Sequence, residues 1–343
     1  GDSKEKHFKT VLKLIDSEIN IISMYQCMIL DGSELGSNFS KNSYNMQTKY
    51  RVLPRCFGIY NFEDKEILSA EIEEICVSTK TLPIEDYYES RSFALTIGLF
   101  YQDRILLELY QYLKNFDISP SELLQILHKN RMSYSNGIKE LFRSFDYDTK
   151  HELWDKKEDV RKIVKKDKRV LEKYAKGELG VNVLFKHRAI GALELIKDIH
   201  DAAFLAALEI LKEKIPEEFQ KSKEFLEELK MFSYLRKTNV FDYEQKFTHR
   251  FSYDFEKLID SNFSEYPIKL KNSINVEFFA DEKQKIMIKE KIEENGSDVN
   301  GIGKILSKML GNMLQRKVKF DSRAMKENIL ENVEISTSPG EFV

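Results

Sequence analysis

The chain has 343 residues, and its 54 basic and 57 acidic side chains leave a formal net charge of −3. This balance of charge argues against a dedicated binder of nucleic acid or of anionic membranes. Hydrophobic residues make up 42 % of the chain, which is enough to build a core and excludes a disordered protein.

The usage of cysteine, proline and glycine narrows the class of protein further. Three widely spaced cysteines suit a reducing cytoplasm rather than a disulfide scaffold, because an odd number cannot all pair. No apolar run is long enough to span a bilayer and no signal peptide is visible, so we predict a cytoplasmic protein without a membrane partner. Six prolines and fourteen glycines among many Lys, Glu, Leu and Ile predict a largely helical chain.

The first predicted element is an amphipathic helix from Asp2 to about Ser17. Asp2 can cap it, and Glu5 at the third position completes a capping-box-like pair. Apolar residues at the spacing i, i+3, i+4 and i+7 give the helix one buried face: Phe8, Val11, Leu12 and Ile15.

Residues 19–30 are the most continuously apolar, strand-like segment of the chain, and a turn with Gly32 and Ser33 follows them. A strand that is apolar on both faces is typical of a parallel sheet covered by helices, because neither face meets water. We therefore predict the last helix and strand of an α/β barrel or doubly wound unit. Since a parallel sheet cannot begin with its last strand, we expect the earlier strands to lie upstream of Gly1.

Residues 37–61 are polar and aromatic, and they contain Arg51, Arg55 and Cys56. This composition predicts an irregular, positively charged loop that lines a site. Together with the preceding helix and strand, it forms the first predicted unit, residues 1–60.

A mainly helical domain is predicted over residues 61–270. It begins with a strand or helical turn at 71–77, followed by helices that cover 82–116, with a break expected near Gly98, and 119–145. The charged span 150–176 is typical of a solvated helix face. Apolar helices are predicted over 183–214 and 217–234, where Pro216 ends the first, and 238–270 is predicted to be irregular or mixed.

The third predicted unit, residues 271–343, is a small α/β unit. The alternation over 274–279 predicts a strand, and helices are expected over 281–294 and 303–315. Lys317 to Phe320 alternates briefly as a further short strand. The predicted fold class is therefore mixed α/β and predominantly helical.

Residues 23–35, SMYQCMILDGSEL, together with the helix before them, resemble the last part of a radical S-adenosylmethionine (SAM) barrel. In that family the sixth strand ends in a Gly-Thr/Ser turn, which Gly32 and Ser33 match. Four further patterns are similar to the extension of the cobalamin-binding subgroup: Arg55-Cys-Phe-Gly58, Glu71 to Ile75, Asp86-Tyr87 with Arg91, and Phe278 with Gly296 and Gly303 to Leu306.

The resemblance implies that the chain is the C-terminal part of such an enzyme: the terminal β/α unit of a partial TIM barrel, then a helical domain and a small α/β end unit. The full-length parent would cleave SAM reductively or use methylcobalamin for a methyl transfer. The CxxxCxxC loop that holds the [4Fe–4S] cluster is absent, because Cys27, Cys56 and Cys76 are 29 and 20 residues apart. The cluster ligands and any cobalamin domain would lie upstream as partners, and this chain alone would be inactive.

The same resemblance places Tyr25, Gln26 and Met28 beside the SAM adenosine, as cofactor-binding candidates. Gln26 is the odd polar residue in an apolar segment. The alternative is a core strand with one satisfied amide.

Candidate contacts to a small-molecule or peptide substrate follow from the same comparison. Asp31 and Ser33 lie at the C-terminal end of the strand, where barrel active sites gather, although turn chemistry alone explains them too. Arg51 and Arg55 can clamp a carboxylate or phosphate, and the alternative is that both are solvated loop arginines.

The six histidines show no paired metal spacing, so no metal site is predicted from them. Three function classes stay open: a fragment of a radical SAM enzyme, a non-catalytic helical scaffold that binds a protein partner, and a nucleic-acid binder. The near-neutral charge gives the last class poor support.

Overall fold

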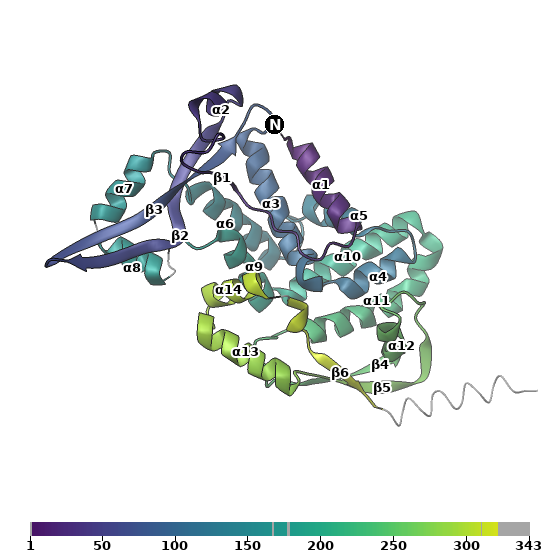
Figure 1. Cartoon of the computed structure of the whole chain (residues 1–343). Coiled ribbons are helices and arrows are strands. Elements are labelled where there is room, and N and C mark those ends of the chain that lie inside the picture. The colour runs from purple at the N-terminus through teal and green to yellow at the C-terminus, as the bar shows by residue number, and fades with distance from the viewer. Residues whose placement is uncertain (1, 167, 177–178, 310, 322–343) are drawn as a thin grey trace, which may run out of the picture.

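The computed structural model describes residues 2–166, 168–176, 179–309 and 311–321. A helical core forms the centre of the molecule, and a small sheet lies at each of two sides (Figure 1). The core helices are α1 (Lys4–Asp16), α3 (Ile84–Phe100), α4 (Leu107–Lys114), α5 (Pro120–Lys129), α6 (Asn136–His151), α9 (Val183–Glu194), α10 (Ile196–Lys214) and α11 (Pro216–Lys237).

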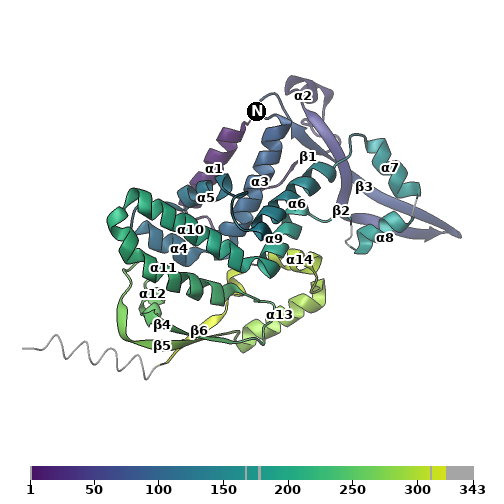
Figure 2. The ribbon, with the colours of Figure 1, turned by 180° about the vertical axis from the view of Figure 1, so that it is seen from behind.

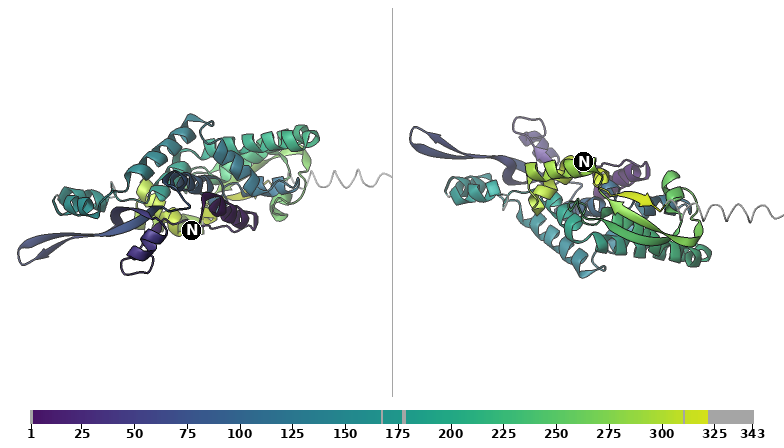
Figure 3. Two further views of the ribbon diagram at one scale, coloured as in Figure 1. Left: turned by 90° about the horizontal axis from the view of Figure 1, so that it is seen from above. Right: turned by 90° about the horizontal axis from the view of Figure 1, so that it is seen from below.

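The first sheet has the strand order β1-β3-β2, and each strand pair is antiparallel. β2 and β3 form a long hairpin that projects beyond the helices, as the views from above and below show (Figure 3). Its two-residue turn is Glu63-Asp64, both with positive φ as a type I′ turn requires. The sheet and its covering helices are β1 (Cys27–Ile29), β2 (Gln47–Phe62), β3 (Lys65–Ser78), α2 (Asn38–Ser43), α7 (Lys157–Lys166) and α8 (Lys168–Lys176).

The second sheet, of order β4-β5-β6, is also antiparallel and packs under α11 (Figure 2). Phe232 of α11 stacks on Phe255 with ring centroids 4.3 Å apart, so the sheet and the helices share one core. Its elements are β4 (Phe247–Tyr253), α12 (Phe255–Asp260), β5 (Lys269–Phe279), α13 (Glu282–Asn295), α14 (Val299–Lys308) and β6 (Lys317–Phe320), with short 3₁₀ turns η1 (Gln102–Arg104) and η2 (Gly311–Met313) elsewhere.

The prediction of a mixed α/β, predominantly helical chain is confirmed. Local signals explain the helix ends: Ser119 caps α5 ahead of Pro120, and Asp281 and Gln284 form a capping box on α13. The N-cap of α1 is Ser3 rather than Asp2. The apolar run 183–214 is two helices, because the backbone leaves helical geometry at Leu195.

Two predictions about the first sixty residues are wrong. Residues 37–61 are not an irregular loop, because residues 47–62 form β2 and pair with β3. Residues 19–30 are not a strand buried on both faces: only residues 27–29 form β1, which pairs antiparallel with β3, and Leu30 is 64 % exposed. The described ranges contain no parallel strand pair, so the barrel unit is not seen in them.

A fully buried carboxylate joins α4 to α11 inside the helical core. Glu108 accepts hydrogen bonds from Lys237 Nζ at 2.5 Å, Arg236 Nη1 at 2.9 Å and Ser233 Oγ at 3.2 Å. Burial by itself would raise the pKa of Glu108, but the charges of Lys237 and Arg236 outweigh it and lower the pKa to about 2. The folded state therefore holds Glu108 ionised.

Replacement of Glu108 by Gln should lower the free energy of unfolding by roughly 3–5 kcal/mol at neutral pH, because Lys237 stays buried without its counter-charge. Urea denaturation measures this loss. Glu122→Gln is the matched control: its pair with Lys214 is at the surface, so the loss should stay below about 1 kcal/mol.

The stability of the wild type and that of Glu108→Gln should respond differently to acid. The folded pKa of Glu108 lies below the usual glutamate value of 4.5, so its stabilisation is present above about pH 4.5 and is lost as the pH falls towards 2. The difference between wild type and Glu108→Gln should therefore shrink over this range. If the difference in unfolding free energy between the two proteins is small at neutral pH, or does not change with pH, Glu108 is not an ionised partner of Lys237.

Two cysteines lie directly opposite each other in the first sheet. Cys27 of β1 pairs in register with Cys76 of β3. Such residues point to one face with Cα atoms about 4.5–5.5 Å apart, which is within disulfide range. A hydrogen bond with the Cys76 thiol lowers the pKa of Cys27 to about 6, which favours the nucleophilic thiolate.

Oxidised glutathione should therefore link Cys27 to Cys76, with loss of both thiol hydrogens and reduction of glutathione to its thiol form. Peptide mass mapping detects the linked peptides. A Cys56→Ser variant should form the same link, and Cys76→Ser should not. Failure of the wild type to link these two residues would disprove the register of β1 on β3.

Candidate functional site

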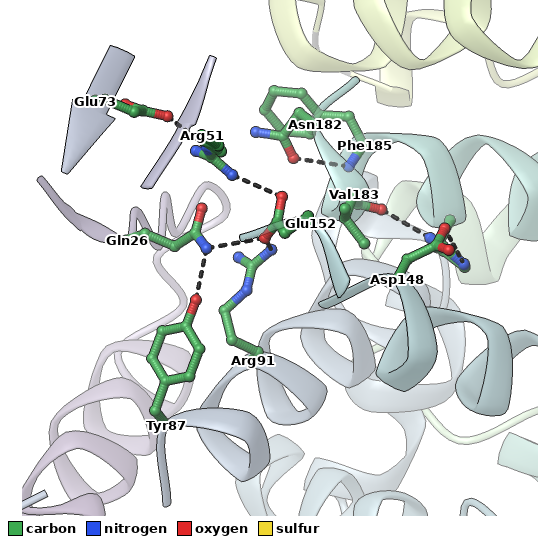
Figure 4. A network of polar contacts seen from close by, with 11 residues as sticks. Gln26, Arg51, Glu73, Tyr87, Arg91, Asp148, Glu152, Asn182, Val183 and Phe185 are labelled. Carbon is green, nitrogen blue, oxygen red and sulfur yellow. Dashed lines mark hydrogen bonds and ion pairs between the residues drawn. The ribbon is translucent and has the colours of Figure 1, made fainter. Parts of the chain in front are cut away.

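A cavity of about 260 Å³ lies where the first sheet meets the helical core. One wall is the extended segment from Asn20 to Met28, and the other walls come from β2, β3, α3, η1, α9 and α14. The polar side chains on the sheet side of this cavity are drawn in Figure 4. Segments far apart in the sequence therefore meet here.

Glu152, at the end of α6, lies at the centre of these side chains (Figure 4). It accepts hydrogen bonds from Arg51 Nη1 at 2.7 Å and from Gln26 Nε2 at 3.0 Å, and Arg91 Nη2 is 3.9 Å away. The Gln26 amide also donates to the Tyr87 hydroxyl at 2.6 Å. One carboxylate thus ties together the segment 20–28, β2 and α3.

The sheet register explains why Arg51 meets Glu152. Arg51 lies directly opposite Glu73 of β3 and donates a hydrogen bond to it. Next to it, the backbone of Tyr50 exchanges two hydrogen bonds with Trp154, at 2.7 and 2.8 Å. This bridge holds the chain after α6 against β2 and brings Glu152 within reach.

Electrostatics keep this cluster charged. Burial would lower the pKa of Arg51, but the carboxylates of Glu152 and Glu73 outweigh it and raise the pKa. Burial raises the pKa of Tyr87, which keeps its hydroxyl neutral as the acceptor for Gln26.

Arg188 of α9 lines the other side of the cavity. Its Nη2 donates to Asp103 Oδ2 at 2.7 Å, and Asp103 lies in η1 with a φ of 61°. Gly98 makes room for the arginine, because a Cβ at this position would stand 2.8 Å from Arg188 Cδ. The absence of a side chain at Gly98 therefore lets the Arg188 stem lie across α3.

Four of the residues singled out from the sequence lie at the cavity. Gln26 and Arg51 belong to the Glu152 cluster, and Tyr25 and Met28 line the cavity with exposed side chains. Tyr25 is 83 % exposed, so its ring is open to solvent.

The other three residues singled out from the sequence lie elsewhere. Asp31 is exposed and accepts from Lys157 Nζ at 3.3 Å. The Ser33 hydroxyl donates to the Leu30 carbonyl at 2.7 Å, which is the turn chemistry given above as its alternative role. Arg55 is in β2, and its side chain lies outside the described part of the structure.

Sequence reasoning missed Arg188, Asp103 and Glu152 as site residues, and it named Arg91 within a pattern similar to the cobalamin-binding subgroup rather than as a site residue. A signal was present for the two arginines. Arg91 is the lone charge of an apolar helical stretch, SRSFALTIGLF, and Arg188 follows Lys186 and His187 directly before the apolar run AIGAL. Arginines on such a face are rarely buried unless a partner compensates the charge.

The described residues contain no group of three or more His, Cys, Asp or Glu that could hold a metal ion. The cysteines therefore do not fit a [4Fe–4S] cluster here, since Cys27 and Cys76 face each other and Cys56 is in β2. No helix in the described ranges has the length and apolarity needed to cross a membrane.

No protein-family model matches the chain, and no curated protein matches its sequence. The site is therefore interpreted from its own geometry. A small cavity, a buried charge cluster and an exposed aromatic side chain are typical of a binding site for a polar small molecule or a chain end.

Gln26→Ala should loosen the segment 20–28, because this change removes its hydrogen bonds to Glu152 and Tyr87. We expect a loss of roughly 1–2 kcal/mol in unfolding free energy and faster amide exchange over residues 19–26. Tyr25→Ala, at an exposed position, should stay within about 0.5 kcal/mol. Equal exchange in both variants would show that Gln26 does not hold the segment.

Proposed function

We propose that this chain is the C-terminal part of a radical SAM enzyme and that it forms the wall that covers the substrate. The proposal starts from the resemblance of residues 23–35 to the end of the family's barrel. Catalytic activity would belong to a longer protein, whose upstream region carries the cluster and SAM.

The observation that carries the proposal is the exposed apolar segment beside a charged cavity. Ile21, Tyr25, Met28 and Leu30 are all exposed, although nine of the twelve residues of the segment 19–30 are apolar. β1 is the edge strand of its sheet, so one of its sides has no neighbouring strand within the described ranges. An apolar edge of this kind is a template for pairing with another strand.

The cavity supports the proposal that this chain forms the wall that covers the substrate. Gln26 and Arg51 join the Glu152 cluster, and the exposed ring of Tyr25 is available to stack on a planar group such as the adenine of SAM. The described cysteines do not fit the iron–sulfur cluster, so this chain would contribute binding and shielding of the substrate rather than cluster ligands.

A non-catalytic helical scaffold is the second candidate function. The helices share one core with the second sheet, and Glu108 accepts three hydrogen bonds inside it, so contacts within this chain support the packing of the helical part. In this case the exposed segment 19–30 would be a surface for a protein partner.

The surface itself can be tested in solution. We expect the chain to self-associate, and Leu30→Ser or Ile21→Ser to reduce the association, because these side chains expose apolar area on the segment. Leu205→Ser, on the exposed side of α10, is the matched control and should leave association unchanged. Sedimentation velocity measures the self-association of each protein. A monomer at high concentration that unfolds in two states would count against a missing barrel.

The enzyme and the scaffold are separated by the coding sequence upstream of Gly1. The proposal expects a CxxxCxxC motif there. It also expects the protein from the whole reading frame, reconstituted anaerobically with iron and sulfide and reduced with dithionite, to cleave SAM to methionine and 5′-deoxyadenosine. A start codon close to Gly1, or the absence of 5′-deoxyadenosine, would remove the enzyme and leave the scaffold.

A further inference from the structure

We infer that the cavity binds an anionic group, a phosphate or a carboxylate, between Arg91 and Arg188. As the ligand of the site described above, this anion rests on the proposed function for its role. The binding itself rests on the geometry of the two arginines.

Arg91 is buried, and its ion pair with Glu152 is long. It is 8 % exposed, and its Nε has no hydrogen-bond partner among the described residues. Its nearest carboxylate, Glu152, is 3.9 Å away, and Arg51 and Gln26 take the shorter contacts with that carboxylate. The face of the Phe145 ring, 5.6 Å from the Arg91 guanidinium carbon, supplies only weak compensation.

Arg188 has a spare donor as well. It is 7 % exposed, one of its terminal nitrogens binds Asp103, and its Nε has no hydrogen-bond partner in the described part of the chain. An unsatisfied buried donor on a charged group is costly, and each such group in a native structure calls for a partner. Arg131 and Arg236 also have a buried Nε without a partner in the described chain, but Arg91 and Arg188 are the two arginines of this kind whose side chains line the cavity.

The charges around the cavity also favour an anionic ligand. Its lining contains four basic side chains, Arg51, Arg91, Arg188 and Lys308, against two acidic ones, Glu73 and Asp103. Glu152 offsets part of this excess through Arg51. The chain as a whole carries a net charge of −3, so this concentration of positive charge is local.

The helix arrangement adds to this field. Asn182 caps the N-terminus of α9 and also lines the cavity, so the positive end of the helix dipole lies at its wall. Arginine is suited to the task, because its planar fork of donors matches the oxygens of a phosphate or carboxylate. A cavity of about 260 Å³ fits one small anionic group rather than a whole macromolecule.

Isothermal titration of this chain with inorganic phosphate, and separately with acetate, tests the inference at low ionic strength. We expect saturable binding of one anion per chain, weakened about tenfold or more by Arg91→Gln and by Arg188→Gln, in line with the loss of a charge-assisted hydrogen bond. Arg143→Gln, on the surface of α6, is the matched control and should bind as the wild type does.

Arg188→Lys keeps the charge but removes the fork, so it provides a readout if a glutamine variant fails to fold. It should bind more weakly than wild type while circular dichroism stays unchanged. Preference for phosphate or for acetate identifies which of the two anions the cavity takes. Absence of saturable binding with both, or binding that none of the arginine variants changes, overturns the inference.

The two proposals fail in different experiments. Anion binding is measured on this chain without SAM, and release of 5′-deoxyadenosine is measured on the longer protein. Loss of binding with intact SAM cleavage removes only the anion site. Binding without SAM cleavage removes only the enzyme.

Discussion

The ion pair between Arg51 and Glu152 is the contact on which the arrangement of the site depends. The β2–β3 hairpin projects beyond the core helices, with α7 and α8 beside it (Figure 1), and at its base it is held by this pair and by the Tyr50–Trp154 bridge. Both side chains of the pair are largely buried, where charge interactions are stronger than in water. Because Glu152 also binds Gln26, the same carboxylate sets the position of the segment 20–28.

Two buried charge clusters in this molecule have different properties. Around Glu108, one carboxylate accepts hydrogen bonds from Lys237 and Arg236 and ties two helices together, although Arg236 Nε has no partner in the described chain. Arg91 and Arg188 also have an Nε without a partner there, and unlike Arg236 they line a cavity. A charge network inside a core stabilises a fold, whereas arginines at a cavity are placed to meet a ligand.

The exposed segment 19–30 and the charged cavity are complementary features of one surface. The segment lines the cavity with some side chains and presents Ile21 and Leu30 to solvent with others. An apolar edge beside a charged cavity is compatible with the proposal that this surface is a substrate wall completed by a second structural unit.

Much of the helical fold followed from the sequence, because its signals are local: the apolar spacing after Asp2, Pro120 behind its cap, and the Asp281 capping box act within one or two turns. The sheet at the site did not follow. Apolarity over 19–30 indicated a buried strand, but the pairing partner, β3, is chosen by long-range hydrogen bonds that no local pattern encodes. The sequence alone therefore determined the class, most of the helices and, as separate candidates, Gln26 and Arg51. Only the tertiary structure brought Arg91 and Arg188 to one cavity and placed Glu152 between Arg51 and Arg91, because proximity between distant segments arises from packing.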